Sequence, residues 1–308
     1  MTARWQSPNR RDWLRSALAF TLVGRTGLAS FRADPVEQIR AKGRAAQMAP
    51  FDTSESVHFL GVGDAPAQQR ADALALCEAF AADYFVHFRA KGFTLDWPTA
   101  RLPVVILAGS QSYAAFEKGF GDEAVGGHFD LDANWLVTFD FGDKIRGMRP
   151  AEADEARLNN TLTLVHETFH QLSYNTGLLD RTADVPLCVV EGLATYAETW
   201  RPAHKGTIGA INVRRRRGLE LAQRAGARWL PIDRLLGDDG SLNDEKTQQV
   251  AYAESALLVH KLLRDPVRLP EFRAYLKAAS KSADPRGRVA LAVTHFGDLD
   301  KLDREIRR

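Results

Sequence analysis

Two histidines and a glutamate in the middle of the chain have a spacing suited to metal chemistry. His166, Glu167 and His170 form the pattern H-E-x-x-H. On a helix, residues i and i+4 lie on one face, so both imidazoles can reach one ion. Glu167 is not needed as a ligand and can instead hold and deprotonate a metal-bound water. The pattern therefore predicts a zinc site with its own general base.

A downstream glutamate could complete the ligand set. Glu191 lies one turn inside a second predicted helix, which follows Pro186 and runs through Val189 to about Trp200. Two helices joined by a short loop tend to pack together, so Glu191 can face the histidines. Gly192 would let the two backbones approach closely. Two histidines and one glutamate, with one position open for water, form a known catalytic zinc arrangement.

The two ends of the first helix can be predicted from the sequence. Asn159 or Asn160 is expected to cap its start, with residues 161–174 as its body. Gly177 can end it in a left-handed conformation. A solvated helix face with salt bridges is the alternative explanation of an isolated H-E-x-x-H, and the nearby E-G-L-A-T-Y segment weakens that alternative.

The combination H-E-T-F-H and E-G-L-A-T-Y-A-E resembles the gluzincin metallopeptidases, zincins whose third zinc ligand is a glutamate on a following helix. With L-A-G-S-Q-S-Y-A-A-F-E and G-G-H-F-D-L-D-A-N-W-L-V-T-F-D upstream, about residues 100–265 resemble an uncharacterised bacterial family of that clan. The resemblance implies zinc ligands at His166, His170 and Glu191, with Glu167 as general base. It implies no particular substrate. Relatives often have P-x-W-L-x-E-G before the ligand glutamate, whereas this chain has P-L-C-V-V-E-G, which keeps the helix apolar.

A tyrosine further along is a candidate for stabilising negative charge. The segment 248–264 predicts a strongly apolar helix with Tyr252 near its start. In gluzincin-like chains such a helix follows the ligand glutamate, and its tyrosine can point toward the metal. The resemblance thus makes Tyr252 a candidate donor to the oxyanion, a role that needs a donor where charge develops. A core tyrosine bonded elsewhere is the alternative.

The remaining patterns predict an α+β, zincin-like fold with a small N-terminal sheet, a central H-E-x-x-H helix and a mainly helical C-terminal part. Strands are expected at residues 57–60 and 103–108, the latter central in the sheet, and a hairpin at 127–131 and 135–139. In zincins an edge strand pairs with the extended peptide, and the resemblance assigns that role to one arm of the hairpin.

We expect residues 34–308 to form a single catalytic domain. Its sheet-containing lobe would cover residues 34–158 and its helical lobe residues 159–308. Residues 1–33 would be an export signal or an N-terminal helix.

The N-terminal segment resembles a twin-arginine export signal. Arg10 and Arg11 precede an aromatic residue, a leucine and an apolar stretch over residues 17–24. Arg25 interrupts the apolar run and no good A-x-A cleavage site follows, so an amphipathic N-terminal helix in a cytoplasmic protein is the alternative. The run is too short for a membrane span, and no other segment is long enough.

Composition and charge limit the classes of binding partner to expect. The 308 residues include 41 basic and 39 acidic side chains, a net charge of +2 that gives no reason to expect nucleic acid or an anionic membrane. The run Arg214 to Arg217 predicts a solvated helix face, with recognition of an acidic substrate group as the alternative. Cys77 and Cys188 are expected to be small buried hydrophobes, and they could pair only if export and geometry allowed it.

Together these features predict a Zn²⁺-dependent peptidase acting on a peptide or protein substrate. One alternative is a zinc-binding or peptide-binding envelope protein on the same fold without turnover. Another is a helical structural or interaction protein in which His166, Glu167 and His170 lie on the surface.

Overall fold

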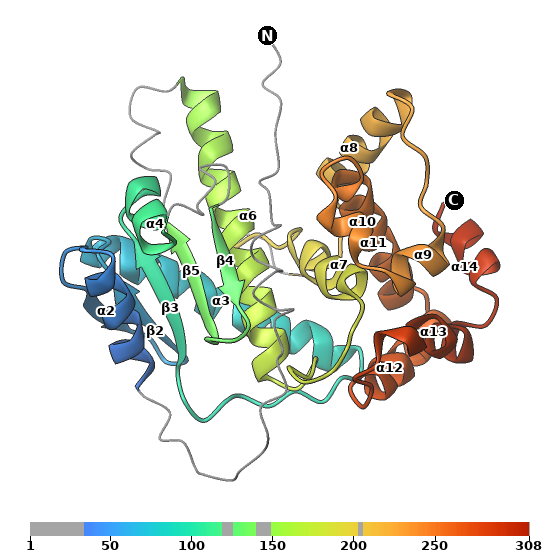
Figure 1. Cartoon of the computed structure of the whole chain (residues 1–308), viewed down its shortest axis with the longest axis horizontal. Helices are drawn as coiled ribbons and strands as arrows, with labels where there is room; N and C mark the ends of the chain where they lie inside the picture. The colour runs from blue at the N-terminus through green and yellow to red at the C-terminus, as the bar shows by residue number, and fades with distance from the viewer. Residues whose placement is uncertain (1–33, 119–125, 140–148, 203–205, 308) are drawn as a thin grey trace. The chain divides into compact units, whose positions relative to one another are not determined.

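A computed structural model of the chain describes residues 34–307 except 119–125, 140–148 and 203–205 (Figure 1). These residues form twelve α-helices and a five-stranded sheet, which confirms the α+β prediction. The export signal predicted within residues 1–33 lies outside the described part of the chain and stays a prediction. In the described part, no helix has the length and apolar character needed to cross a membrane.

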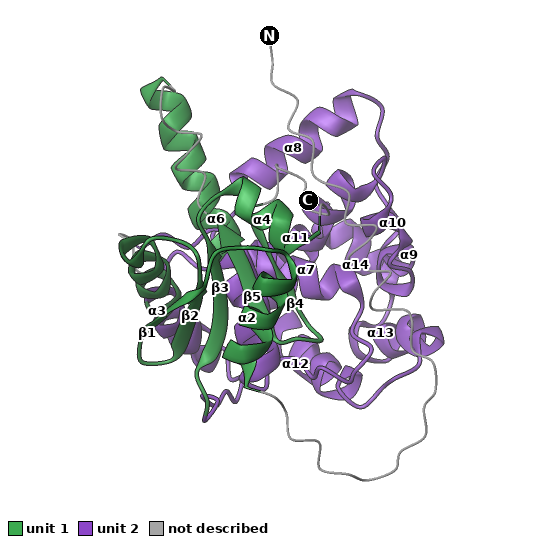
Figure 2. Cartoon of the chain, turned by 60° about the vertical axis from the view of Figure 1, so that its left-hand side comes forward, with its two compact units in different colours: residues 1–78, 100–164 green, residues 79–99, 165–308 purple. Residues whose placement is uncertain are grey.

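The chain divides into two compact units (Figure 2). The first comprises residues up to Glu78 together with Ala100–Leu164, and the second comprises Ala79–Thr99 together with Val165–Arg308. Helices α3 (Ala67–Ala90) and α6 (Pro150–Asn175) contribute residues to both units. The second unit contains all five residues predicted to act at the site.

The sheet belongs to the first unit and has the strand order β1-β2-β3-β5-β4. Its three inner strands are parallel, and each edge strand pairs antiparallel with its neighbour. The prediction of a central strand and a β4–β5 hairpin is confirmed. The bounds are β1 Asp52–Glu55, β2 Phe59–Gly63, β3 Leu102–Leu107, β4 Gly127–Asp130 and β5 Trp135–Phe139.

The strand expected at residues 57–60 is displaced. Strand β2 begins only at Phe59, because the preceding residues form a bend in which Val57 is 74% exposed. Strand β4 lies at the sheet edge, as predicted for one arm of the hairpin. Its role in binding peptide stays a prediction.

One face of the sheet is covered by α2 (Pro35–Ala45) and α4 (Ser110–Phe116) (Figure 1). Alternate residues of each strand point to this face, because side chains along a strand alternate between the two sides. The buried cluster that results consists of Ile39, Phe51, Val62, Val105, Leu107, Tyr113, Phe116, Trp135, Val137 and Phe139.

The second unit is helical apart from its loops and one 3₁₀ turn, which agrees with the predicted C-terminal part. The helix predicted at residues 248–264 has those bounds, and both cysteines are buried and lie outside any disulfide, as expected. The elements are α7 Leu187–Ala197, α8 Val213–Arg224, α9 Ile232–Gly237, α10 Gly240–Asn243, α11 Gln248–Arg264, α12 Arg268–Ala279, η1 Pro285–Gly287, α13 Arg288–Phe296 and α14 Leu299–Ile306.

Helix α6 begins earlier than predicted. Asn159 and Asn160 lie inside the helix and do not cap it. The helix starts instead at Pro150, a residue suited to the first helical position. The Glu152 carboxylate accepts a bond from the backbone N–H of Arg149 at 3.2 Å, as an N3 glutamate does in a capping box. The helix therefore runs without a break from Pro150 through the H-E-x-x-H residues to Asn175.

Gly177 follows the end of α6 with a φ of 91°, which confirms the left-handed terminator. Gly192 has a different partner from the one expected. A Cβ on Gly192 would lie 2.5 Å from the carbonyl oxygen of Ser255, so the close approach is between α7 and α11. Gly192, beside the predicted ligand Glu191, thus serves the packing of the C-terminal helices.

Gly192→Ala is therefore expected to lower the free energy of unfolding by about 1–3 kcal/mol, because the backbone carbonyl of Ser255 must move to admit the methyl group. Gly218→Ala on α8 is the matched control. There the nearest atom lies 3.5 Å away, and alanine should stabilise the helix by about 0.5–1 kcal/mol. Urea denaturation measures both changes, and equal effects of the two substitutions would contradict the packing argument.

A buried carboxylate on α11 makes the stability of the second unit depend on pH. The side chain of Glu254 is 3% exposed, and both its oxygens lie 3.1 Å from the backbone nitrogen of Leu230. Burial raises the pKa of Glu254 to about 8, although the N–H of Leu230 and the charge of Arg307 act to lower it. The folded protein therefore holds a proton that the unfolded chain releases near pH 4.5.

Stability should consequently fall as pH rises from about 5 to about 8, because the unfolded state binds fewer protons in this window. Glu254→Gln keeps an acceptor for Leu230 and should remove this loss, leaving stability unchanged at pH 5 and raising it by about 1–3 kcal/mol at pH 8. Unfolding curves at the two pH values measure the difference. A variant whose stability falls as steeply as that of the wild type would refute the role of Glu254.

Candidate metal centre

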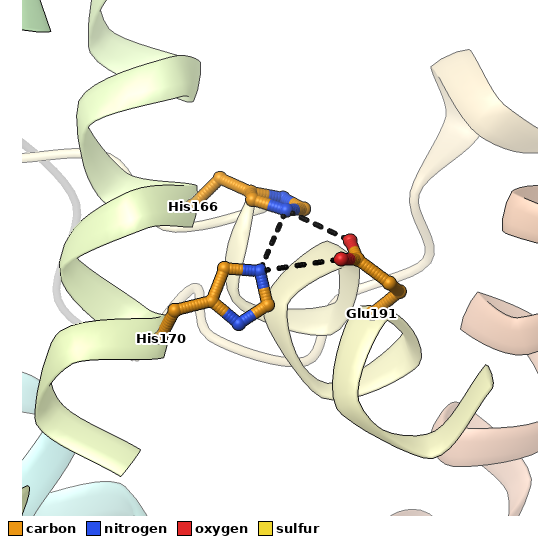
Figure 3. A group of neighbouring side chains, drawn as sticks. All are labelled: His166, His170 and Glu191. Carbon is orange, nitrogen blue, oxygen red and sulfur yellow. Dashed lines mark hydrogen bonds and ion pairs between the residues drawn. The ribbon is translucent and has the colours of Figure 1, made fainter. Parts of the chain in front are cut away.

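The three predicted ligands converge in the structure. His166 and His170 lie one turn apart on α6, and Glu191 is the fifth residue of α7. One ligand atom from each residue lies within 4.8 Å of the other two. Figure 3 shows the three side chains pointing toward one another from the two helices. The sequence prediction that Glu191 faces the imidazole pair is thus realised.

The spacing of the ligand atoms suits a small cation. His166 Nε2 lies 3.2 Å from Glu191 Oε2 and 3.1 Å from His170 Nε2. His170 Nε2 lies 3.7 Å from Glu191 Oε1. Ligands about 2.0–2.1 Å from a tetrahedral zinc ion are about 3.3 Å from one another. The donor set therefore fits a metal ion in both chemistry and size.

Burial and charge also favour a cation between these groups. His166 and His170 are each 5% exposed and Glu191 is 1% exposed. Burial alone would lower the pKa of His166, but its hydrogen bonds with Glu191 and Glu198 outweigh this and raise the pKa to about 9. A buried carboxylate needs a compensating positive charge, and a proton or a metal ion can supply it. The group His166, His170 and Glu191 could hold a metal ion.

Both helices are fixed locally around the site. On α6, Phe169 lies between the two histidines in sequence and packs its ring against Tyr84 and Phe88 of α3. At the start of α7, the backbone N–H of Leu187 donates to Asp239 Oδ1 at 2.9 Å. This bond satisfies one of the free N–H groups at the helix N-terminus, one turn before Glu191.

Residues 160–285 match a family model described as protein of unknown function (DUF1570). The match covers less than half of the chain and includes all five predicted site residues. It agrees with the resemblance to an uncharacterised family and shows no protease family. A search of curated proteins gives no match.

Glu167 and Tyr252 are the two predicted residues outside the ligand group. Glu167 is 4% exposed, directly follows His166, and its negative charge contributes to the raised pKa of that histidine. Tyr252 is 7% exposed on α11, and its ring centre lies 5.6 Å from the guanidinium carbon of Arg215. The base and oxyanion roles assigned to them stay predictions. The burial of both histidines and Glu167 argues against the alternative that placed them on the surface.

Sequence reasoning missed one residue that contacts a ligand. Glu198 Oε1 lies 3.0 Å from His166 Nδ1, the ring nitrogen that faces away from Glu191. Burial alone would raise the pKa of Glu198, but the charge of Arg215 and the hydrogen bond with His166 hold it well below its usual range. A signal for this residue was present in the sequence. Glu198 follows Glu191 by seven residues, which places it two turns further along the same helix face.

Proposed function

We propose that this protein is a zinc-dependent peptidase. The observation that carries the proposal is the convergence of both H-E-x-x-H imidazoles and the Glu191 carboxylate at tetrahedral spacing. The buried Glu167 beside them adds a carboxylate that the ligand set does not require. Peptide hydrolysis needs such a base, whereas a purely structural zinc site does not.

The metal identity rests on the donor set. Two imidazoles and one carboxylate are the ligands of catalytic zinc sites, and the same donors also bind non-haem iron. The H-E-x-x-H spacing, with its second carboxylate in the same turn, favours zinc and hydrolysis. We therefore assign zinc, held by His166, His170 and Glu191.

A bound zinc ion would lower the pKa of a water molecule toward neutrality and polarise the substrate carbonyl. Glu167 accepts a proton from the attacking water and later passes it to the leaving amine. Glu198 accepts a hydrogen bond from His166 Nδ1–H and so directs the other ring nitrogen to the ligand group. The hydroxyl of Tyr252 is our candidate donor to the developing oxyanion. Its ring contact with Arg215, which bonds to Glu198, supports a position near this network.

Elemental analysis of the purified chain, combined with a peptide-library cleavage assay, tests the proposal. We expect about one zinc per chain, and cleavage that a chelator abolishes and added zinc restores. Bound metal without cleavage of any peptide would favour the alternative of a non-catalytic zinc-binding or peptide-binding protein. A chain that binds no zinc would overturn the proposal.

A further inference from the structure

The four consecutive arginines of α8 do not share one environment. The side chain of Arg216 is 53% exposed and lies 3.6 Å from Glu220 on the same helix. The prediction of a solvated helix face describes this residue well. Arg215, its neighbour in sequence, is only 25% exposed and forms an ion pair with Glu198. One residue of the run is therefore partly buried and turned toward Glu198.

Arg215 holds the Glu198 carboxylate with two hydrogen bonds. Its Nη2 donates to Oε1 at 2.6 Å and its Nε donates to Oε2 at 3.2 Å. Such a pair of hydrogen bonds from one guanidinium group, here called the fork, fixes the plane of a carboxylate as well as its position. The Glu198 side chain is only 9% exposed, so water competes little with these bonds. Lysine offers a single point charge and would not fix the plane in the same way.

Asn212 ties the same carboxylate to the start of α8. Its Oδ1 accepts from the backbone N–H of Arg215 at 3.1 Å, which makes it the helix cap. Its Nδ2 donates to Glu198 Oε2 at 3.0 Å. The first turn of α8 therefore supplies three donors to the two oxygens of one carboxylate.

The fixed carboxylate in turn contacts a predicted metal ligand. Glu198 Oε1 lies 3.0 Å from His166 Nδ1, while His166 Nε2 lies 3.2 Å from Glu191. A carboxylate at Nδ1 sets the tautomer and the orientation of a ligating imidazole. A carboxylate that could rotate freely would set neither.

We propose that Arg215 and Asn212 are positioning residues of the metal centre, which act by holding Glu198 against His166. This inference rests on the metal site of the proposed function and extends it to the first turn of α8. It explains why one arginine of an otherwise solvated run points inward. It also predicts that metal affinity depends on residues that do not touch the metal.

The alternative is that these bonds only attach α8, whose single buried residue is Leu219. Loss of attachment alone would lower the melting temperature without changing the metal site. Zinc affinity, measured by competition with a chelator, and the visible spectrum of the Co²⁺-loaded chain separate the two roles. Both report on the ligands themselves and need no catalytic activity.

Three variants and one control make the test. Arg215→Met removes the fork, and Arg215→Lys keeps only the charge. Asn212→Asp retains a good helix cap but replaces the donor to Glu198 with a like charge. Arg216→Met, one residue away on the exposed face, is the matched control.

We expect Arg215→Met and Asn212→Asp to weaken zinc binding about 10-fold or more and to alter the cobalt spectrum, since loss of outer partners typically costs 10–100-fold. Arg215→Lys should recover part of the affinity, and Arg216→Met should match the wild type. If Arg215→Met does not fold, Asn212→Asp decides the question. If the variants that fold keep the zinc affinity and the cobalt spectrum of the wild type, the positioning role is wrong and the metal site itself is unaffected. A wild-type chain that binds neither metal would overturn the metal site as well.

Discussion

Replacing Glu167 with glutamine is expected to abolish peptide hydrolysis while zinc remains bound. The amide has the size of the carboxylate, so the buried position should tolerate it, but it cannot accept a proton from water. General-base catalysis contributes about 10²–10⁴-fold, so the rate should fall by at least 100-fold. His166, His170 and Glu191 are unchanged, and zinc content should equal that of the wild type.

The control for this experiment is Glu155→Gln, an exposed glutamate on the same helix. It should retain both zinc and activity. Initial rates on a cleaved peptide, measured beside zinc content, give the comparison. If Glu167→Gln kept full activity, the assignment of the general base would be wrong even with the metal site intact.

Glu191→Ala and His166→Ala are expected to lose the metal itself. Each substitution removes one of the three donors, and the loss should exceed the roughly 100-fold that removal of an outer partner costs. A ligand that binds only the folded state stabilises it by about 4 kcal/mol at 1,000 times its Kd. Zinc should therefore raise the melting temperature of the wild-type chain and leave that of the variants almost unchanged.

The matched control is Glu220→Ala, which removes an exposed glutamate of α8 that pairs with Arg216 across 3.6 Å. Its response to zinc should equal that of the wild type. Equilibrium dialysis gives the affinities directly. Glu191→Ala with undiminished zinc binding would show that the carboxylate on α7 is not a ligand, and the proposed hydrolase would lose its basis.

Local spacing predicted much of the site from the sequence. His166 and His170 share a helix face because they are four residues apart, whatever the rest of the fold does. The apolar periodicity and the terminal residues located α11 and the end of α6 at Gly177 in the same way. The exact start of α6 was missed, because asparagine caps some helices and lies inside others, and only the conformation of the residues upstream of it distinguishes the two cases.

Apart from the approach of Glu191 to the histidines, contacts between helices could not be predicted in this way. The structure pairs Gly192 with Ser255, whereas the sequence suggested an approach to the histidine helix. It also turns Arg215 inward to Glu198 and leaves Arg216 in solvent, although the two are adjacent members of one run.

The sequence by itself thus determined which residues could bind a metal and which helices carry them, because the histidine spacing within α6 and the short connection to α7 are local features of the chain. Only the tertiary structure decided which side chains contact those residues. That choice depends on how α7, α8 and α11 pack, and packing is set by the summed shape of many side chains distant in sequence.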